Sequence, residues 1–326
     1  MRISTLVLVG VTLGLLVGLA TTHSHAQTSS ITGPILGFVP ETSSSSVRPI
    51  LGIPDASLLG EPLGFGSEVR MVAISPKQDF GVAVRKEDAQ FVLIPFRENL
   101  EMIPIFGTAT EDSLIAISPT GSAVAQVDSD SRRVRFMTGS TEFDVSMVPG
   151  RITQLGISDD AAVALLKSTA EDGDSLWVVD ASNAPRQIAL DRPGAFAFFP
   201  KRRDVAAIEE SNKSVVVIRN VDADATRIPL FSANETIATL SSVAALDDAR
   251  QVVVADGNIG IVAVVDVETG MASYTSCSCR PTGLFRLKGT SIFRLEDPSQ
   301  EPIWILDASS EPRTIVIPPA SKGAPR

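Results

Sequence analysis

The stretch LIAISPTGSAVAQVDSDSRRVRFMTGSTEFDVSMV, residues 114–148, decides the fold. It contains four short segments rich in apolar residues, LIAIS, SAVAQV, RRVRFM and EFDVSMV, separated by the runs PTG, DSDS and TGST. Segments of this length bounded by Gly, Pro, Asp and Ser are typical of strands and tight turns, and they are too short for helices. The stretch therefore predicts four consecutive β-strands.

The same unit recurs along the chain. It occurs six times, with equivalent first-segment residues Ile74, Ile117, Ile157, Phe198, Leu246 and Leu287. Successive equivalents are 40 to 48 residues apart. A four-stranded unit repeated at this period is typical of a β-propeller blade, which buries its faces against neighbouring blades around an axis. We predict an all-β fold, a β-propeller of six four-stranded blades.

The residues before the repeats have a different pattern. Residues 35–53, ILGFVPETSSSSVRPILGI, contain two strand-like segments around a serine-rich turn. They predict an N-terminal hairpin comparable with the outer half of a blade, and the alternative is a ring of seven blades, one of them incomplete. The predicted divisions of the chain are a signal peptide at 1–26, a leader and hairpin at 27–65, the propeller at 66–319 and a flexible tail at 320–326.

The repeat resembles a known class of propeller. The first-segment signature VAISP, residues 72–76, is similar to the AFSPDG step of WD-repeat proteins and related exported bacterial propellers. The resemblance covers residues 66–319 and implies the fold without a function. The Gly-His and Trp-Asp marks of true WD repeats are absent from the sequence.

The first 26 residues predict export. Arg2 is followed by an apolar run at residues 6–20, and Ser24-His25-Ala26 places small residues where a signal peptidase cleaves. An uncleaved membrane anchor is the alternative, since residues 3–22 just suffice to span a bilayer. We expect cleavage and a secreted or periplasmic protein of a bacterium. No later run approaches ~20 apolar residues, so we expect no membrane span after cleavage.

Charge narrows the classes of partner. Cleavage would remove both histidines and Arg2, so 27 basic residues would face 38 acidic ones, a net charge of −11. Nucleic acids and anionic membrane surfaces favour clustered Lys and Arg, so we expect neither as a partner. We expect a monomer that binds a protein or a small anionic ligand.

The chain has two cysteines, Cys277 and Cys279, where the fourth segment of the fifth unit leads into the sixth. Residues two apart on a strand share a face, and an oxidising compartment favours a local disulfide. Unpaired thiols, or metal or redox chemistry, remain alternatives. A structural zinc site needs about four Cys or His ligands, more than the mature chain offers.

Acidic pairs and arginines are the remaining candidates for a site. The pairs Asp128 and Asp130, Asp172 and Asp174, and Asp222 and Asp224 do not complete a calcium loop, so we predict neither a metal nor another cofactor. The candidate anion-binding residues precede or lie in the first segments of their units, and they are Arg70, Arg151, Arg192, Arg280 and Arg286. Such guanidinium groups converging on one face would suit a carboxylate or phosphate. Pairing of each Arg with a nearby carboxylate, such as Glu68, Asp112 or Asp191, is the alternative.

Three functions are compatible with these observations. The first is an exported, non-catalytic propeller that acts as a binding or scaffold module, and we assign no catalytic residue. The second is a lactonase-like propeller hydrolase with acidic residues and a metal in the central channel. The third is a purely structural envelope component. We lean away from an enzyme, because the inner segments carry Ala, Val, Ile and Phe with Arg286 as the main exception.

Overall fold

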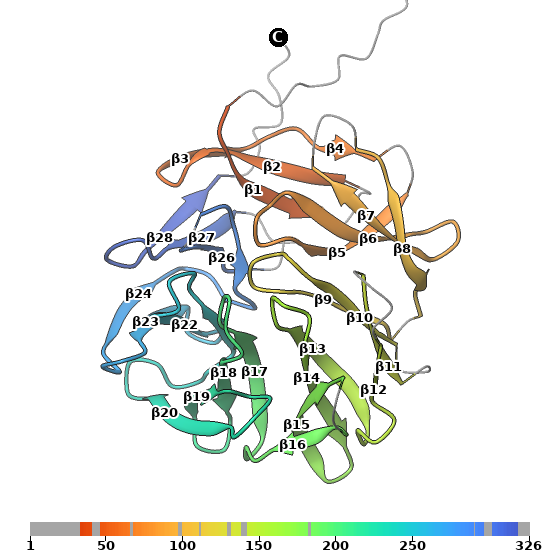
Figure 1. The fold of residues 1–326 in the computed structure, drawn as a ribbon. Helices are drawn as coiled ribbons and strands as arrows, with labels where there is room; N and C mark the ends of the chain where they lie inside the picture. The colour runs from red at the N-terminus through yellow and green to blue at the C-terminus, as the bar shows by residue number, and fades with distance from the viewer. Residues whose placement is uncertain are drawn as a thin grey trace, which may run out of the picture. The chain divides into compact units, whose positions relative to one another are not determined.

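The computed structural model describes residues 33–40, 46–65, 68–96, 100–110, 112–128, 132–137, 142–181, 184–289, 291–296 and 302–318. These residues form seven sheets of four antiparallel strands, all within one compact unit, Thr32–Arg326. Figure 1 shows the sheets following one another around a central axis. The fold is an all-β β-propeller.

The strands of each blade are consecutive in the chain. Blade 1 contains β1 (Ile35–Pro40), β2 (Ser46–Ile53), β3 (Ala56–Leu59) and β4 (Leu63–Gly64). Blade 2 contains β5 (Val69–Ile74), β6 (Phe80–Arg85), β7 (Gln90–Pro95) and β8 (Ile103–Thr108). Blade 3 contains β9 (Leu114–Ile117), β10 (Val124–Asp128), β11 (Arg133–Phe136) and β12 (Glu142–Asp144). Blade 4 contains β13 (Arg151–Ile157), β14 (Val163–Ala170), β15 (Gly173–Asp180) and β16 (Arg186–Ile188).

The remaining three blades follow the same order. Blade 5 contains β17 (Pro193–Phe198), β18 (Val205–Glu209), β19 (Ser214–Arg219) and β20 (Thr226–Ser232). Blade 6 contains β21 (Ser242–Ala245), β22 (Gln251–Asp256), β23 (Ile261–Asp266) and β24 (Ala272–Ser276). Blade 7 contains β25 (Phe285–Arg286), β26 (Ile292–Arg294), β27 (Ile303–Asp307) and β28 (Arg313–Ile317).

Each blade buries both faces of its sheet, and β22 shows how. Val252 and Val254 pack toward blade 5, while Val253 and Ala255 pack toward blade 7. Successive side chains of a strand point to opposite faces, so a strand covered on both sides carries a continuous apolar run, here residues 252–255. Seven hydrophobic clusters result, one at each junction between neighbouring blades.

The prediction of six blades is wrong, and the alternative of seven is confirmed. Residues 35–53 are not an added hairpin, because β1 and β2 belong to a blade of the ring. That blade is the irregular one, since β3 and β4 pair with different parts of β2 instead of forming a third and a fourth strand. The repeat pattern does not reveal it, because its first strand leads into a serine-rich stretch and not into the Ser-Pro turn of the next two units.

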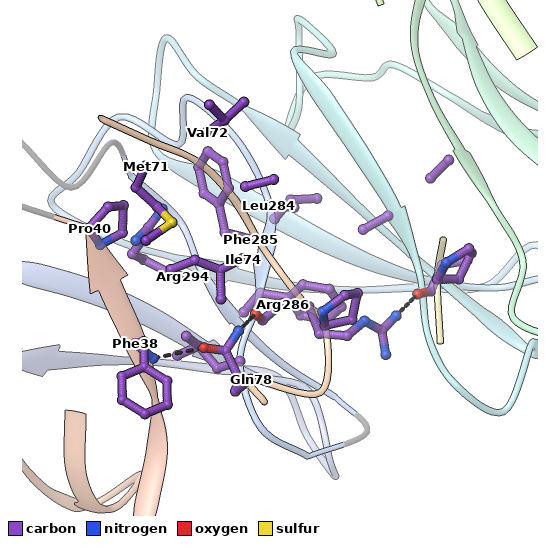
Figure 2. A pocket seen from close by; sticks show the side chains of 18 of the residues that line it. Phe38, Pro40, Met71, Val72, Ile74, Gln78, Leu284, Phe285, Arg286 and Arg294 are labelled. Atoms are coloured by element: carbon purple, nitrogen blue, oxygen red, sulfur yellow. Dashed lines mark hydrogen bonds between the residues drawn. The ribbon is translucent and has the colours of Figure 1, made fainter. Parts of the chain in front are cut away.

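Blade 1 closes the ring by packing and by hydrogen bonds from the side chain of Gln78, which follows β5. Gln78 Oε1 accepts a hydrogen bond of 2.7 Å from the amide of Phe38 in β1. Gln78 Nε2 donates to the carbonyl oxygens of Ser75, at 3.1 Å, and Arg286, at 2.6 Å. Figure 2 shows this side chain between the strands of blades 1 and 7. One buried amide thus joins three blades at the point where the ring closes.

Two predicted segments lie outside the described residues, namely the signal peptide at 1–26 and the tail at 320–326. Among the residues that are described, no helix has the length and apolar character to cross a membrane.

Candidate functional site

A cavity of about 450 Å³ lies among the first strands of the blades, around the axis of the ring. Its walls come mainly from blades 1, 2, 5, 6 and 7. The small side chains of Ala73, Ala197 and Ala245 occupy equivalent positions in three first strands and leave this space open. Its volume lies within the ~300–1,000 Å³ typical of small-molecule sites.

Arg286 takes the equivalent position in blade 7 and brings a charge into the wall. Its guanidinium forms an ion pair with Asp247, donates to the carbonyl oxygen of Ala245 and lies 5.2 Å from the ring centre of Phe293. Burial lowers the pKa of the Arg286 guanidinium and raises the pKa of the Asp247 carboxyl. Desolvation therefore works against both charges, and their mutual attraction offsets part of that cost. Figure 2 shows Arg286 crossing the cavity toward blade 6.

A second arginine of the wall, Arg294, was missed in the sequence. Phe285 of β25 is directly opposite Arg294 of β26, and Arg286 is directly opposite Phe293. The Arg294 guanidinium is buried and lies 4.4 Å from the ring centre of Phe285. The repeated FR dipeptides of GLFRLKGTSIFRL could have indicated it, because two antiparallel strands in this register place each Arg beside a Phe.

The other four predicted arginines do not line the cavity. Arg70, Arg151, Arg192 and Arg280 are exposed and lie at or before the start of the first strands of blades 2, 4, 5 and 7. Arg151 forms an ion pair with Asp112, as the pairing alternative predicted for it. Arg70, Arg192 and Arg280 have no ion pair within the described part of the chain. We call these three the rim arginines.

Acidic side chains near the ends of second strands hold the segments that enter the blades. Glu209 accepts a hydrogen bond of 3.2 Å from the amide of Asp191, and Glu296 accepts one of 3.1 Å from the amide of Arg280. Burial raises the pKa of the Glu296 carboxyl. In blade 6 the buried Asp256 accepts hydrogen bonds from three backbone amides and one hydroxyl group. These carboxylates hold the backbone of the segments that lead into the blades. The carboxylate of Glu296 holds the backbone at Arg280, one of the rim arginines.

One aspartate of each acidic pair is likewise engaged with neighbouring side chains. Asp174 bonds Lys167 at 2.8 Å and Thr169 at 2.7 Å, Asp222 pairs with Arg203, and Asp128 accepts from Thr110 at 3.2 Å. Asp130 lies outside the described residues. In the portion of the chain that is described, no three metal-ligating side chains of the Cys, His, Asp or Glu type are grouped around a common point.

Cys277 and Cys279 form a disulfide, with their Cα atoms 5.0 Å apart. The bridged segment follows β24 and lies on the turn that contains Gly260. The Cys277 amide donates to the Gly260 carbonyl oxygen at 2.8 Å. Gly260 has a φ of +70°, and a Cβ there would approach the carbonyl oxygens of both cysteines to 2.5 and 2.6 Å. Glycine at this turn therefore lets the bridged segment pack closely against the connection between β22 and β23 of blade 6.

Comparisons with known proteins establish the fold and no more. No protein-family model matches the chain, and no curated protein matches it. A solved structure of a functionally unknown protein from Desulfotomaculum acetoxidans is similar with a TM-score of 0.57 and 13% identity, covering 88% of this chain and 100% of the other. The structure of the RRP9 WD40 repeats is similar with a TM-score of 0.53 and 12% identity, and it covers 78% of this chain and 82% of the other. The structure of U3-55K has a TM-score of 0.51 and 12% identity, and it covers 77% of this chain and 82% of the other. The predicted resemblance to WD-repeat propellers is thus confirmed at the level of the fold.

Proposed function

We propose that this propeller is a non-catalytic binding module, and that its axial cavity binds a small anionic ligand with an apolar body. The observation that carries the proposal is the composition of the cavity wall. Side chains such as Met71, Ile74 and Phe38 supply apolar surface, while Arg286 and Arg294 supply two guanidinium groups. Ligand sites combine an apolar lining with a few placed polar groups in this way.

The charge distribution supports an anion in particular. The whole chain has a net charge of −10, so its overall electrostatic field repels anions. The cationic groups gathered around the cavity differ in sign from this overall charge. Arg70 is adjacent in sequence to the cavity residue Met71, and Arg280 lies four residues before Leu284, which also lines the cavity. Rim arginines so close in the chain to the wall would raise the local concentration of an anion at the entrance.

Export forms part of the proposal. The signal-type sequence at residues 1–26 and the Cys277–Cys279 disulfide both support a secreted or periplasmic location, where disulfides persist.

A matched pair of fluorescent probes tests the proposal. 8-Anilinonaphthalene-1-sulfonate carries a sulfonate that the otherwise similar N-phenyl-1-naphthylamine lacks. We expect the sulfonate to bind the folded protein with one site per chain, more tightly than the neutral probe, and with an affinity that falls as salt rises. The measurement is fluorescence titration at low and at high salt.

Variants tie the binding to the rim. Replacing Arg70 and Arg280 together with Gln should weaken sulfonate binding by about three- to tenfold, as expected for the loss of two exposed charges. Lys213→Gln combined with Arg219→Gln, an equal change of charge at exposed positions at the two ends of β19, is the control and should leave the affinity unchanged. Equal affinity for the two probes, or binding of neither, would overturn the proposal.

A further inference from the structure

Phe285 is an exposed aromatic residue on the cavity wall. It is 44% exposed, whereas most large apolar side chains of the described first strands are buried or half-buried. Its ring lies among Leu284, Val72 and Met71 in Figure 2, so the exposed part borders the cavity. A water-exposed aromatic ring inside a concave site costs solvation free energy that a stacked ligand would recover.

The ring is held in place from two sides. Arg294, itself 4% exposed, lies over it with a guanidinium-to-ring-centre distance of 4.4 Å. Gly283 provides the room, since a Cβ at that position would lie 2.8 Å from two ring carbons. A ring fixed by a buried partner loses little conformational entropy when a ligand stacks on it.

The guanidinium also changes what the ring prefers to contact. A cation over an aromatic face attracts the negative charge of its π system, and so favours an electron-rich partner for the part of the ring that remains exposed. Arg286, the next residue, places a second guanidinium in the same wall, where it forms the ion pair with Asp247. Both effects favour a planar ring that bears a negative charge.

Resting on the binding function proposed above, we infer that the ligand class of this cavity is planar aromatic acids, with Phe285 as the stacking platform. The apolar body of the ligand is then an aromatic ring and not an alkyl chain or a saturated ring. The acidic group supplies the negative charge that the guanidinium groups favour.

Two carboxylates of similar size and equal charge test this inference. 2-Naphthoate is planar and aromatic, and decalin-2-carboxylate is its saturated counterpart. We expect calorimetric titration of the full chain to show 2-naphthoate binding about three- to tenfold more tightly, the preference expected of an aromatic pair. In Phe285→Leu, which keeps an apolar side chain, that preference should disappear while decalin-2-carboxylate keeps its affinity.

A control and two distinct failures make the result decisive. Tyr274→Leu removes another exposed aromatic residue, on β24 outside the cavity, and should leave the preference unchanged. If both carboxylates bind with equal affinity, or if Phe285→Leu retains the preference, the inference is overturned and the binding function stands. If neither carboxylate nor the sulfonate probe binds, the binding function itself is overturned.

Discussion

Gln78→Leu should lower the free energy of unfolding by about 3–5 kcal/mol, because it leaves the buried amide of Phe38 and the carbonyl oxygen of Arg286 without their hydrogen-bond partner. The side chain is 7% exposed, so water cannot readily replace it. Leucine has similar bulk, so the change tests the hydrogen bonds and not the packing. Urea unfolding at pH 7 measures the difference.

Gln90→Leu is the matched control. Gln90 begins β7 in the same blade, is half-buried and accepts a hydrogen bond of 2.8 Å from Arg85 alone of the described side chains. Its replacement should cost within about 1 kcal/mol, since one partly solvated hydrogen bond is lost. A loss at Gln78 no larger than that at Gln90 would show that this amide does not hold the ring closed.

Asp256→Asn is the second change expected to have a large effect. The Asp256 carboxylate is fully buried and accepts hydrogen bonds from the amides of Ala238, Thr239 and Asn258 and from the hydroxyl of Thr239, at 2.8 to 3.1 Å. An asparagine can present only one oxygen, so its NH₂ group must face donors. We expect a loss of about 3–5 kcal/mol at pH 7.

The same carboxylate makes stability depend on pH. Burial alone would raise the pKa of Asp256, but the four hydrogen bonds outweigh it and hold that pKa below its usual value. Its contribution is therefore complete above the ordinary pKa of an aspartate and is lost as the pH falls through the lower native value. In Asp256→Asn the free energy of unfolding should therefore fall less steeply as the pH is lowered. Urea unfolding measured from pH 7 downward tests this.

Asp266→Asn provides the comparison within the same blade. Asp266 accepts hydrogen bonds from the amides of Glu268 and Thr269, but it is only half-buried at the end of β23, and these two donors lie on an exposed turn. Its replacement should cost far less, because water can solvate the freed donors. Equal losses at Asp256 and Asp266 would contradict a special role for the buried carboxylate.

The sequence predicts most of the ring from local patterns. The four strands expected within residues 114–148 are β9 to β12, paired in that order. Turn residues and apolar alternation are short-range signals, and each blade repeats them. Blade 1 has the sequence ETSSSS at residues 41–46 where the next two units have SPKQ and SPTG, so its repeat was not recognised and the predicted number of blades was one too low.

The cavity is less predictable, because its contacts are long-range. Gln78 bonds residues 40 and 208 positions away, and nothing beside it in the sequence indicates either partner. Arg286 was singled out because it replaces an alanine in a repeated position, and the structure places it in the wall. Arg294 does not replace an alanine in a repeated position. Its contact with Phe285 follows from the pairing of β25 with β26.

Residues 35–40 and 46–64 form a blade of the ring, and β1 contributes Phe38 and Pro40 to the wall of the cavity. Native-state hydrogen exchange of the full chain, followed by mass spectrometry, tests this assignment most directly. We expect amides of β1 and β2 to exchange as slowly as those of β22, which open only when the whole propeller unfolds. If β1 and β2 exchange rapidly while blades 2 to 7 stay protected, blade 1 is an appended hairpin and the assignment is wrong.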